Sequence, residues 1–207
     1  MKEAIKTFVS GHVLIKDNKT GEVLVDKHNA IHSANMATAI ARGLANAANY
    51  QIYKIKLGNQ GTYIDGTQQI VFRPTNTVSA TLDPTADLYN PTYAEVVDDA
   101  AVDVGTGNSV NYSNIPNSTS TRVIVTSVIS SNEAVNNPTD QGTPGNATTN
   151  PEGTYFFDEL GLFTKHTSGS MLDGAGELML SHIVFSPIEH TGNRELSIVY
   201  TITISVS

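Results

Sequence analysis

The most regular pattern of apolar and polar positions lies at the C-terminal end of the chain, in residues 194–206. The odd positions from Ser197 to Ser205 carry Ser, Val, Thr, Thr and Ser, whereas every even position from 196 onwards is apolar: Leu196, Ile198, Tyr200, Ile202, Ile204 and Val206. A period of two is that of a β-strand whose alternate side chains face opposite ways. Burial of each such side chain is worth about 1.5–3 kcal/mol. The pattern therefore predicts one long, half-buried strand that needs a complementary apolar surface.

Two further segments are candidates for that surface. Residues 177–185 form one apolar run, and the turn-rich residues 186–193 separate it from the last strand. Residues 155–164 form the other, with Leu160 and Leu162 on one face and Phe157 and Phe163 on the opposite face. The links between the three segments are short or rich in turn residues, so we expect the segments to pair in antiparallel fashion.

Residues 7–28 predict a β-hairpin. The turn formers of residues 17–21 separate two runs with apolar residues at alternate positions, namely Val13 and Ile15 in the first run and Val23 and Val25 in the second. Leu14 and Leu24 lie on the second face, which makes the hairpin apolar on both sides. An isolated hairpin is marginally stable in water. We expect a helix, the main sheet or a neighbouring subunit to cover the second face, so Leu14 and Leu24 are candidate subunit-interface residues.

One helix is predicted, from Ala34 to about Ala48, with Ser33 as its N-cap. Met36, Ile40 and Leu44 recur every four residues and, with the alanines beside them, form a narrow apolar stripe. A stripe so rich in alanine lets the helix lie close to a sheet or to the same helix of a second chain.

The middle of the chain alternates short strand-like runs with turns. A strand over residues 52–57 ends at a break in which Gly58 and Gly61 are expected to permit backbone angles that other residues avoid. Further strands are predicted at residues 70–73, 79–82, 93–97, 102–104 and 121–130. The fold class is therefore mainly β, an antiparallel β-sandwich with an N-terminal β-hairpin and one helix at about residues 33–48.

We expect residues 1–32 to form the hairpin arm and residues 33–207 to form the sandwich domain, which includes a long polar loop at 131–153. This loop contains three prolines and almost no large apolar side chains. Loops of this length are uncommon in compact domains unless they have a function. Its candidate partner-binding residues are Asn136, Gln141 and Thr148.

Composition restricts the classes of partner. The chain has 207 residues and 22.1 kDa, and only 15% of the residues are charged, with a net charge of −8. No cluster of Lys and Arg is present to neutralise phosphates, which argues against direct binding of nucleic acid. Cysteine is absent, and no apolar stretch approaches the about 20 residues that span a bilayer. We therefore expect no membrane partner.

Several groups of ionisable residues could suggest metal sites, but structural roles explain them more simply. His28 and His32 are four apart, but they lie where a strand leads into the helix cap, so we interpret them as structural or capping residues and not as metal ligands. The pair Asp83 and Asp87 and the cluster Asp98, Asp99 and Asp103 follow no calcium-loop pattern, so we interpret them as solvated loop charges. No metal or cofactor is expected.

Asp158 and Glu159 differ because they lie inside an apolar strand. At least one of the two carboxylates should be buried or at an interface and should need a partner, for which Arg194 and Lys165 are candidates. Asp158, Glu159 and Arg194 are thus candidate subunit-interface residues. The alternative is an ordinary edge strand.

No enzyme signature is found. The chain contains Ser, His and Asp but has no Gly-X-Ser-X-Gly motif. The turn from Gly58 to Gly61 lacks the Lys and the following helix of a phosphate-binding loop. We expect a protein that is not an enzyme.

Several short motifs follow one another along the chain, namely residues 54–62, residues 157–163, the pair Glu177-Leu178 and the run Phe185-Ser186-Pro187-Ile188 before the last strand. Their order resembles that of bacteriophage tail-collar fibre proteins and related short tail or baseplate structural proteins. Residues 21–32 are similar to the leading segment of uncharacterised phage virion proteins. Together the motifs cover most of the chain.

The resemblance implies a structural component of a tailed-phage virion that is assembled in the host cytoplasm. Proteins of this kind form trimers or rings with copies of themselves and hold fibres or adjacent tail rings. Those fibres continue into a long shaft, whereas this chain ends at Ser207. We therefore expect an adaptor or ring component of the tail, neck or collar, or baseplate, with a trimer or a hexameric ring as its assembly.

The alternative is a carbohydrate-binding or capsid-decorating β-sandwich module that uses the 131–153 loop. Glycan binding that is lost when this loop is deleted would favour the alternative. Association with copies of itself and with other virion proteins would favour the structural component.

Overall fold

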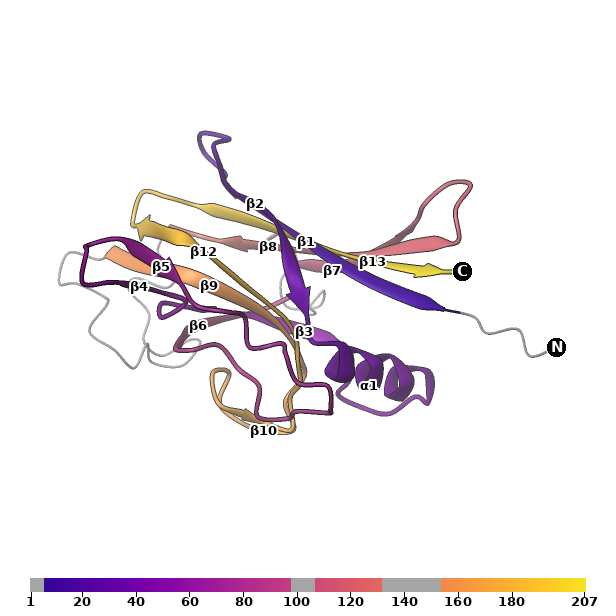
Figure 1. Ribbon diagram of the computed structural model, residues 1–207. Coiled ribbons are helices and arrows are strands. Elements are labelled where there is room, and N and C mark those ends of the chain that lie inside the picture. The colour runs from indigo at the N-terminus through magenta and orange to yellow at the C-terminus, as the bar shows by residue number, and fades with distance from the viewer. Residues whose placement is uncertain (1–5, 98–106, 132–153) are drawn as a thin grey trace.

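The computed structural model describes residues 6–97, 107–131 and 154–207, in which strands predominate and one helix is present. Nine strands form one large antiparallel sheet, and two small hairpins, β4–β5 and β10–β11, lie outside it (Figure 1). The elements are β1 (Thr7–Asp17), β2 (Val23–Ile31), α1 (Ser33–Leu44), β3 (Ile52–Gly58), β4 (Thr62–Ile64), β5 (Ile70–Phe72), β6 (Pro91–Val96), β7 (Ser109–Asn114), β8 (Ser120–Ile129), β9 (Thr154–Thr164), β10 (Ser168–Gly169), β11 (Gly174–Ala175), β12 (Met179–Thr191) and β13 (Leu196–Val206).

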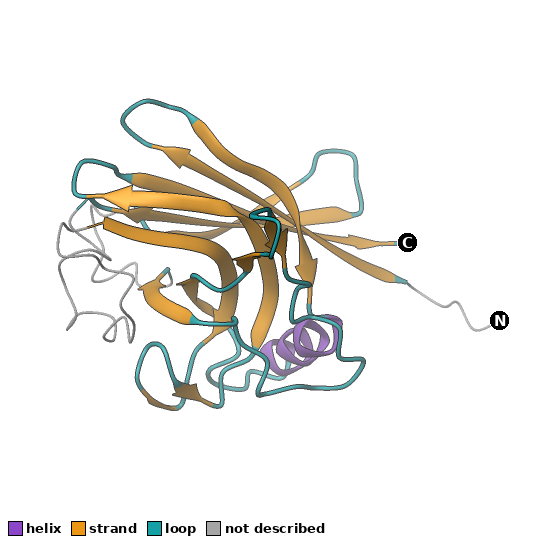
Figure 2. Ribbon diagram, turned by 60° about the vertical axis from the view of Figure 1, so that its left-hand side comes forward, coloured by secondary structure: helices purple, strands orange, loops and turns teal. Residues whose placement is uncertain are grey.

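The large sheet curls into two layers that face each other across the core (Figures 1 and 2). Its strand order is β6-β3-β9-β12-β2-β1-β13-β8-β7, and β2 is the strand that changes layers. The first part of β2 pairs with β1, and its last two residues, Ala30 and Ile31, pair with β12 instead. The buried Tyr200 on β13 donates a hydrogen bond to Ser181 on β12, which joins the two layers through the interior. This architecture confirms the predicted mainly β, antiparallel sandwich.

The alternation in the C-terminal strand is borne out, but its neighbours differ from the expected ones. Leu196, Ile198, Tyr200 and Ile202 are buried in the core. Strand β13 pairs with β1 and β8, whereas the segments expected beside it, β9 and β12, pair with each other in the opposite layer. The short link between β12 and β13 therefore crosses between layers. The N-terminal hairpin lies in the middle of the sheet, in the same core as the rest of the described chain.

Strand β12 is longer than predicted. It continues through residues 186–191, which the sequence had indicated as a turn. An irregularity of the pairing with β9 lies between Val184 and Ile188 and contains Pro187. Because a bulge leaves residues outside the hydrogen-bonded ladder, it accommodates a proline within a strand. The turn signal of Ser186-Pro187 thus marks a bulge.

The helix is confirmed but begins and ends differently from the prediction. Its N-cap is His32 and not Ser33, because Nδ1 of His32 accepts a hydrogen bond from the backbone N–H of Asn35 at 3.3 Å. The helix ends at Leu44, and Asn46 just beyond it has a φ of 56°. Met36 packs into the core, whereas the Leu44 side chain is 86% exposed. Among the described residues, no helix is long and apolar enough to cross a membrane.

The middle of the chain differs in two places from the strands predicted above. Residues 79–82 form a loop, and the polar residues 109–114 form the edge strand β7. The open side between the two layers is bridged by Asn108. Its side-chain amide donates hydrogen bonds to Glu95 at 2.6 Å and to the carbonyl of Val96 at 3.1 Å, and its oxygen accepts one from the N–H of Val128 at 2.8 Å. The predicted strand at 102–104 lies outside the described residues.

From Phe157 to Thr164, strand β9 is buried on both faces. Leu160 and Leu162 contribute to the main core, whereas Phe163 belongs to a small second cluster with Leu88 and Met179. Loops that precede β6 and β12 cover this second face (Figure 2). The apolar part of this second face is therefore small.

Candidate functional site

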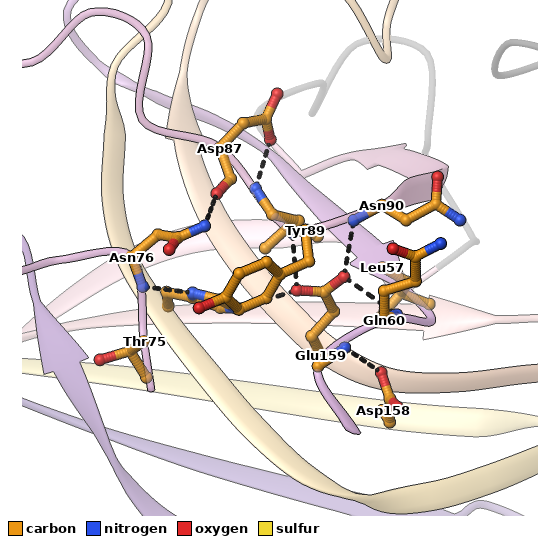
Figure 3. Close-up of polar contacts among 12 residues, drawn as sticks. Leu57, Gln60, Thr75, Asn76, Asp87, Tyr89, Asn90, Asp158 and Glu159 are labelled. Atoms are coloured by element: carbon orange, nitrogen blue, oxygen red, sulfur yellow. Dashed lines mark hydrogen bonds and ion pairs between the residues drawn. The ribbon is translucent and has the colours of Figure 1, made fainter. Parts of the chain in front are cut away.

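The Glu159 carboxylate is the centre of a buried polar network on the second face of β9 (Figure 3). It accepts hydrogen bonds from the backbone N–H groups of Tyr89 at 2.9 Å, Asn90 at 3.0 Å and Gln60 at 3.4 Å. These residues belong to two loops that are distant in the sequence. One carboxylate therefore anchors both loops to the sheet.

His182 on β12 supplies the fourth donor to Glu159. Its Nδ1 accepts a hydrogen bond from the backbone N–H of Asn76 at 2.9 Å, so the ring proton is on Nε2, which lies 3.1 Å from the Glu159 carboxylate. The contact is thus a hydrogen bond from a neutral imidazole. Burial acts to raise the pKa of Glu159, but the bonds from His182, Tyr89 and Asn90 outweigh it and lower the pKa.

Asp158 faces away from Glu159 and anchors the start of β4. Its carboxylate accepts hydrogen bonds from the N–H groups of Gly61 and Thr62, both at 2.8 Å, and from the Thr62 hydroxyl. Burial raises the pKa of Asp158 despite these bonds, and the nearby charge of Glu159 acts in the same direction. The partners expected for this pair, Arg194 and Lys165, are not the ones found. Arg194 contacts Asp17 at 3.1 Å instead.

Gly58 and Gly61 allow the close approach of these loops. Neither has a positive φ, so the expectation that they are needed for unusual backbone angles is wrong. A Cβ at Gly58 would lie 2.6 Å from the carbonyl oxygen of Asn90 and 2.5 Å from the Glu159 carboxylate. The glycine provides space for the polar network.

A second buried network contains two lysines and two acids. Lys56 Nζ lies 2.5 Å from Oε1 of Glu177, 2.8 Å from Oδ2 of Asp87 and 2.7 Å from the carbonyl of Leu172. Lys54 Nζ forms an ion pair with Oε2 of Glu177 at 2.6 Å, although this contact lacks the alignment of a hydrogen bond. Burial lowers the pKa of Lys54 and raises the pKa of Asp87. Asp87 is thus not the solvated loop charge that we expected.

The remaining predicted residues are scattered over the molecule. Leu14 and Leu24 are half-buried, and Leu24 packs against the main core. Asp83 holds the side-chain amide of Asn35 through its backbone. Residues Asn136, Gln141 and Thr148, with Asp98, Asp99 and Asp103, lie outside the described residues. In the described part of the chain, no three His, Asp or Glu side chains gather as a metal site.

An apolar groove lies between helix α1 and the start of β1. It has a volume of about 550 Å³ and is lined by Thr7, Val9, Ile31, Ser33, Met36, Ala37, Ile40, Ala41 and Leu44. No lining residue is charged. A smaller apolar cavity of about 150 Å³ continues under the helix towards Tyr50 and Val123. The helix therefore covers this end of the sheet incompletely.

One wall of the groove is a free strand edge. Lys6 and Ser207 form a hydrogen-bonded pair, in which each backbone N–H donates to the C=O of the other residue. In this antiparallel register, the N–H and C=O groups of the even-numbered β1 residues therefore point towards β13. Those of odd residues point the other way, and β2 pairs with them only from Gly11 onwards. In the described structure, the N–H and C=O groups of Thr7 and Val9 thus face the groove without a strand beside them.

A second exposed apolar surface lies on the β4–β5 hairpin. Tyr63, Ile64, Ile70 and Phe72 are 46–71% exposed, and Phe156 on β9 is 42% exposed. An apolar cavity of about 260 Å³ between the hairpin and Phe156 is bordered by Pro187. Asp158 fixes the hairpin at Thr62 from below. The hairpin is thus an apolar protrusion that Asp158 anchors to the sheet.

Sequence reasoning missed both the groove and the burial of Lys54 and Lys56. The apolar stripe of the helix was visible, but nothing local shows that β2 leaves β1 after Asn29. Lysines at alternate positions of a strand usually mark a solvent-facing side, and here loops from distant parts of the chain cover them. No family model matches this chain, and comparisons with curated proteins and with solved structures find no match either.

Proposed function

We propose that this chain is a structural component of a tailed-bacteriophage virion. It acts as an adaptor of the tail, neck or collar, or baseplate, which associates with copies of itself and docks fibres or adjacent tail rings. The order of the sequence motifs supports the virion assignment. The surface of the fold supports the mode of action, because its exposed apolar areas suit contacts with other protein chains.

The observation that carries the proposal is the free edge of β1 beside the α1 groove. Unpaired backbone groups of a strand edge accept an added strand from another chain. Here the groups of Thr7 and Val9 would form the ladder, and the groove would bury alternate apolar side chains of the added strand. The occupant is a strand of a second copy, and repetition of this contact around an axis closes a trimer or a hexameric ring.

The experiment measures the mass of the purified chain against concentration, by light scattering or sedimentation. Thr7→Pro removes one backbone donor from the free edge and leaves the β1–β13 ladder intact, because proline is tolerated at strand edges. Leu44→Lys places a charge at the groove. We expect both variants to shift assembly to at least tenfold higher concentration while the melting temperature of the monomer stays unchanged.

Two variants serve as controls. Phe8→Pro removes a donor that the register directs towards β13, so it should destabilise the fold itself. Tyr112→Lys changes a side chain that is 78% exposed on β7 and does not line the groove, so it should leave assembly unchanged. A chain that stays monomeric at all concentrations, or assembly that Thr7→Pro and Leu44→Lys leave intact, contradicts this mode of association.

The virion assignment needs a separate test. Purified particles of the phage that encodes the chain should contain it at a fixed copy number by quantitative mass spectrometry, and a particle map should place it in the tail, neck or baseplate. Its absence from purified particles would overturn the assignment even if the chain assembles in solution.

A further inference from the structure

Three side chains with complementary chemistry meet beneath the β10–β11 hairpin. They are Lys56 on β3, Asp87 in the segment before β6 and Glu177 just before β12. Lys56 Nζ lies 2.8 Å from Oδ2 of Asp87 and 2.5 Å from Oε1 of Glu177. The side chain of Lys56 is fully buried, and the ring centroid of Phe163 lies 4.3 Å from Nζ.

We propose that the Lys56 amine and the Asp87 carboxyl group condense into an intramolecular amide bond, with Glu177 as the group that transfers protons. The inference goes beyond the proposed virion role and does not depend on it. It assigns a self-modification to a cluster that would otherwise be a set of ion pairs.

The reaction balances without an oxidant, reductant or cofactor. A proton first moves from the Lys56 ammonium to the Asp87 carboxylate, so that both groups are neutral. The Nζ lone pair then attacks Cγ of Asp87 and forms the C–N bond. Glu177 takes a proton from the nitrogen and delivers it to the departing hydroxyl as the Cγ–O bond breaks. The products are one amide and one water, and Glu177 returns to its initial state.

Burial favours the neutral form of Asp87 that this reaction needs. A low dielectric disfavours the charged forms of both acids and amines. Burial accordingly raises the pKa of Asp87 and lowers that of the neighbouring Lys54. A lysine in a desolvated pocket is an activated nucleophile. The fixed contact between Nζ and the carboxyl group also replaces an encounter in solution by an intramolecular approach.

The exposure of the three groups differs in a way that suits the reaction. The Lys56 side chain is 0% exposed and that of Glu177 8%, whereas that of Asp87 is 32% exposed. A cavity of about 470 Å³ borders Asp87. The nucleophile and the proton-transfer group are thus shielded, while the water released at Asp87 has a route to solvent.

Lys54 provides an internal comparison. It is also fully buried and contacts Glu177 at 2.6 Å, but its other contact is the backbone carbonyl of Met171. Among the described residues, Lys56 alone contacts both an acid to attack and a second acid to transfer the proton. The amide would tie β3 to the segment before β6 and close a covalent loop over residues 57–86, which includes the β4–β5 hairpin.

The test is the intact mass of the full-length chain under denaturing conditions, followed by peptide mapping. We expect the mass to be lower than the sequence mass by one water, and we expect a branched peptide that joins Lys56 to Asp87. Lys56→Arg and Asp87→Ala should restore the full sequence mass, and Glu177→Gln should reduce the converted fraction at least tenfold. Lys54→Arg is the matched control and should keep the loss of water.

Several results would overturn the proposal. Wild-type protein that is folded by circular dichroism and keeps its full sequence mass after prolonged incubation shows that the groups form only ion pairs. Loss of water that maps to Asp65-Gly66 or Asp173-Gly174 and is cleaved by hydroxylamine shows a succinimide instead. If Asp87→Ala does not fold, Asp87→Asn preserves the shape and should give the same amide with loss of ammonia; its retention of the full mass contradicts the reaction.

Discussion

Replacement of Glu159 by Gln tests whether a buried carboxylate holds the loops of this fold. The change conserves size and leaves one oxygen acceptor in place of two. Four N–H donors surround the carboxylate, two at each oxygen: Asn90 and Gln60 at Oε1, and Tyr89 and His182 at Oε2. In either orientation of the new amide, its NH₂ group faces two donors.

The size of the effect follows from these two lost bonds. His182 does not relieve the conflict by exchanging its ring proton, because its Nδ1 already accepts a bond from the N–H of Asn76. A buried donor left without an acceptor costs about 1–3 kcal/mol. Two such donors predict that the free energy of unfolding of Glu159→Gln is lower by about 2–6 kcal/mol. This is a large part of the stability of an ordinary domain.

The assay is urea unfolding at pH 7, with the midpoint and the slope fitted separately. Glu189→Gln is the matched control, because Glu189 is an exposed residue of β12 and the same change there should alter the free energy by no more than about 0.5 kcal/mol. Hydrogen exchange provides a local readout. The amides of Tyr89 and Asn90 should exchange faster in Glu159→Gln and remain protected in Glu189→Gln.

The reasoning fails on either of two results. A midpoint shift in Glu159→Gln no larger than that in Glu189→Gln would show that the carboxylate does not stabilise the loops. Unchanged protection at Tyr89 and Asn90, despite a loss of global stability, would show that these amides have other acceptors.

Three more perturbations address other parts of the fold. Burial lowers the pKa of His190 to about 4 from 6.5, so the free energy of unfolding should decrease as the pH falls from about 6.5 to 4, by up to about 3 kcal/mol. In a series of urea midpoints measured against pH, His190→Gln should flatten this part of the curve. Gly58→Ala should destabilise by about 1–3 kcal/mol in thermal unfolding, whereas Gly66→Ala, which has open space around it, should not. Asn108→Ala should cost about 2–3 kcal/mol and speed amide exchange at Val128, and intact exchange there would contradict its role as a bridge.

Many of the strands could be predicted from the sequence, because apolar and polar residues alternate with a period of two in a half-buried strand. The pattern from Leu196 to Ile202 matches the buried positions of β13, and the pair Val13 and Ile15 is buried as expected. The sequence did not show which strands pair with each other. Strand β2 leaves β1 for β12 near Asn29, and this departure depends on packing across the whole sandwich. The layers could therefore not be assigned from short links alone.

Polar edge strands and buried charged residues could not be predicted from the sequence either. Strand β7 is mostly polar and has exposed residues from Asn111 to Asn114, and a strand without a fully buried face shows no clear alternation. Lys54 and Lys56 occupy the face of β3 that alternation makes polar, yet loops from residues 83–90 and 166–177 enclose them. A local pattern shows which face of a strand is polar. Whether that face meets water depends on the loops above it.

These loops explain why so many charges lie inside a protein of low charge content. The second face of β9 offers only Leu88, Phe163 and Met179 as an apolar cluster, which is too little to fix the covering loops by packing. Loop backbones carry N–H groups that need acceptors once water is excluded. Glu159 and Asp158 supply those acceptors at fixed points of the sheet. The loops and the β4–β5 hairpin are thus positioned by hydrogen-bond geometry, and the hairpin keeps its own apolar side chains exposed.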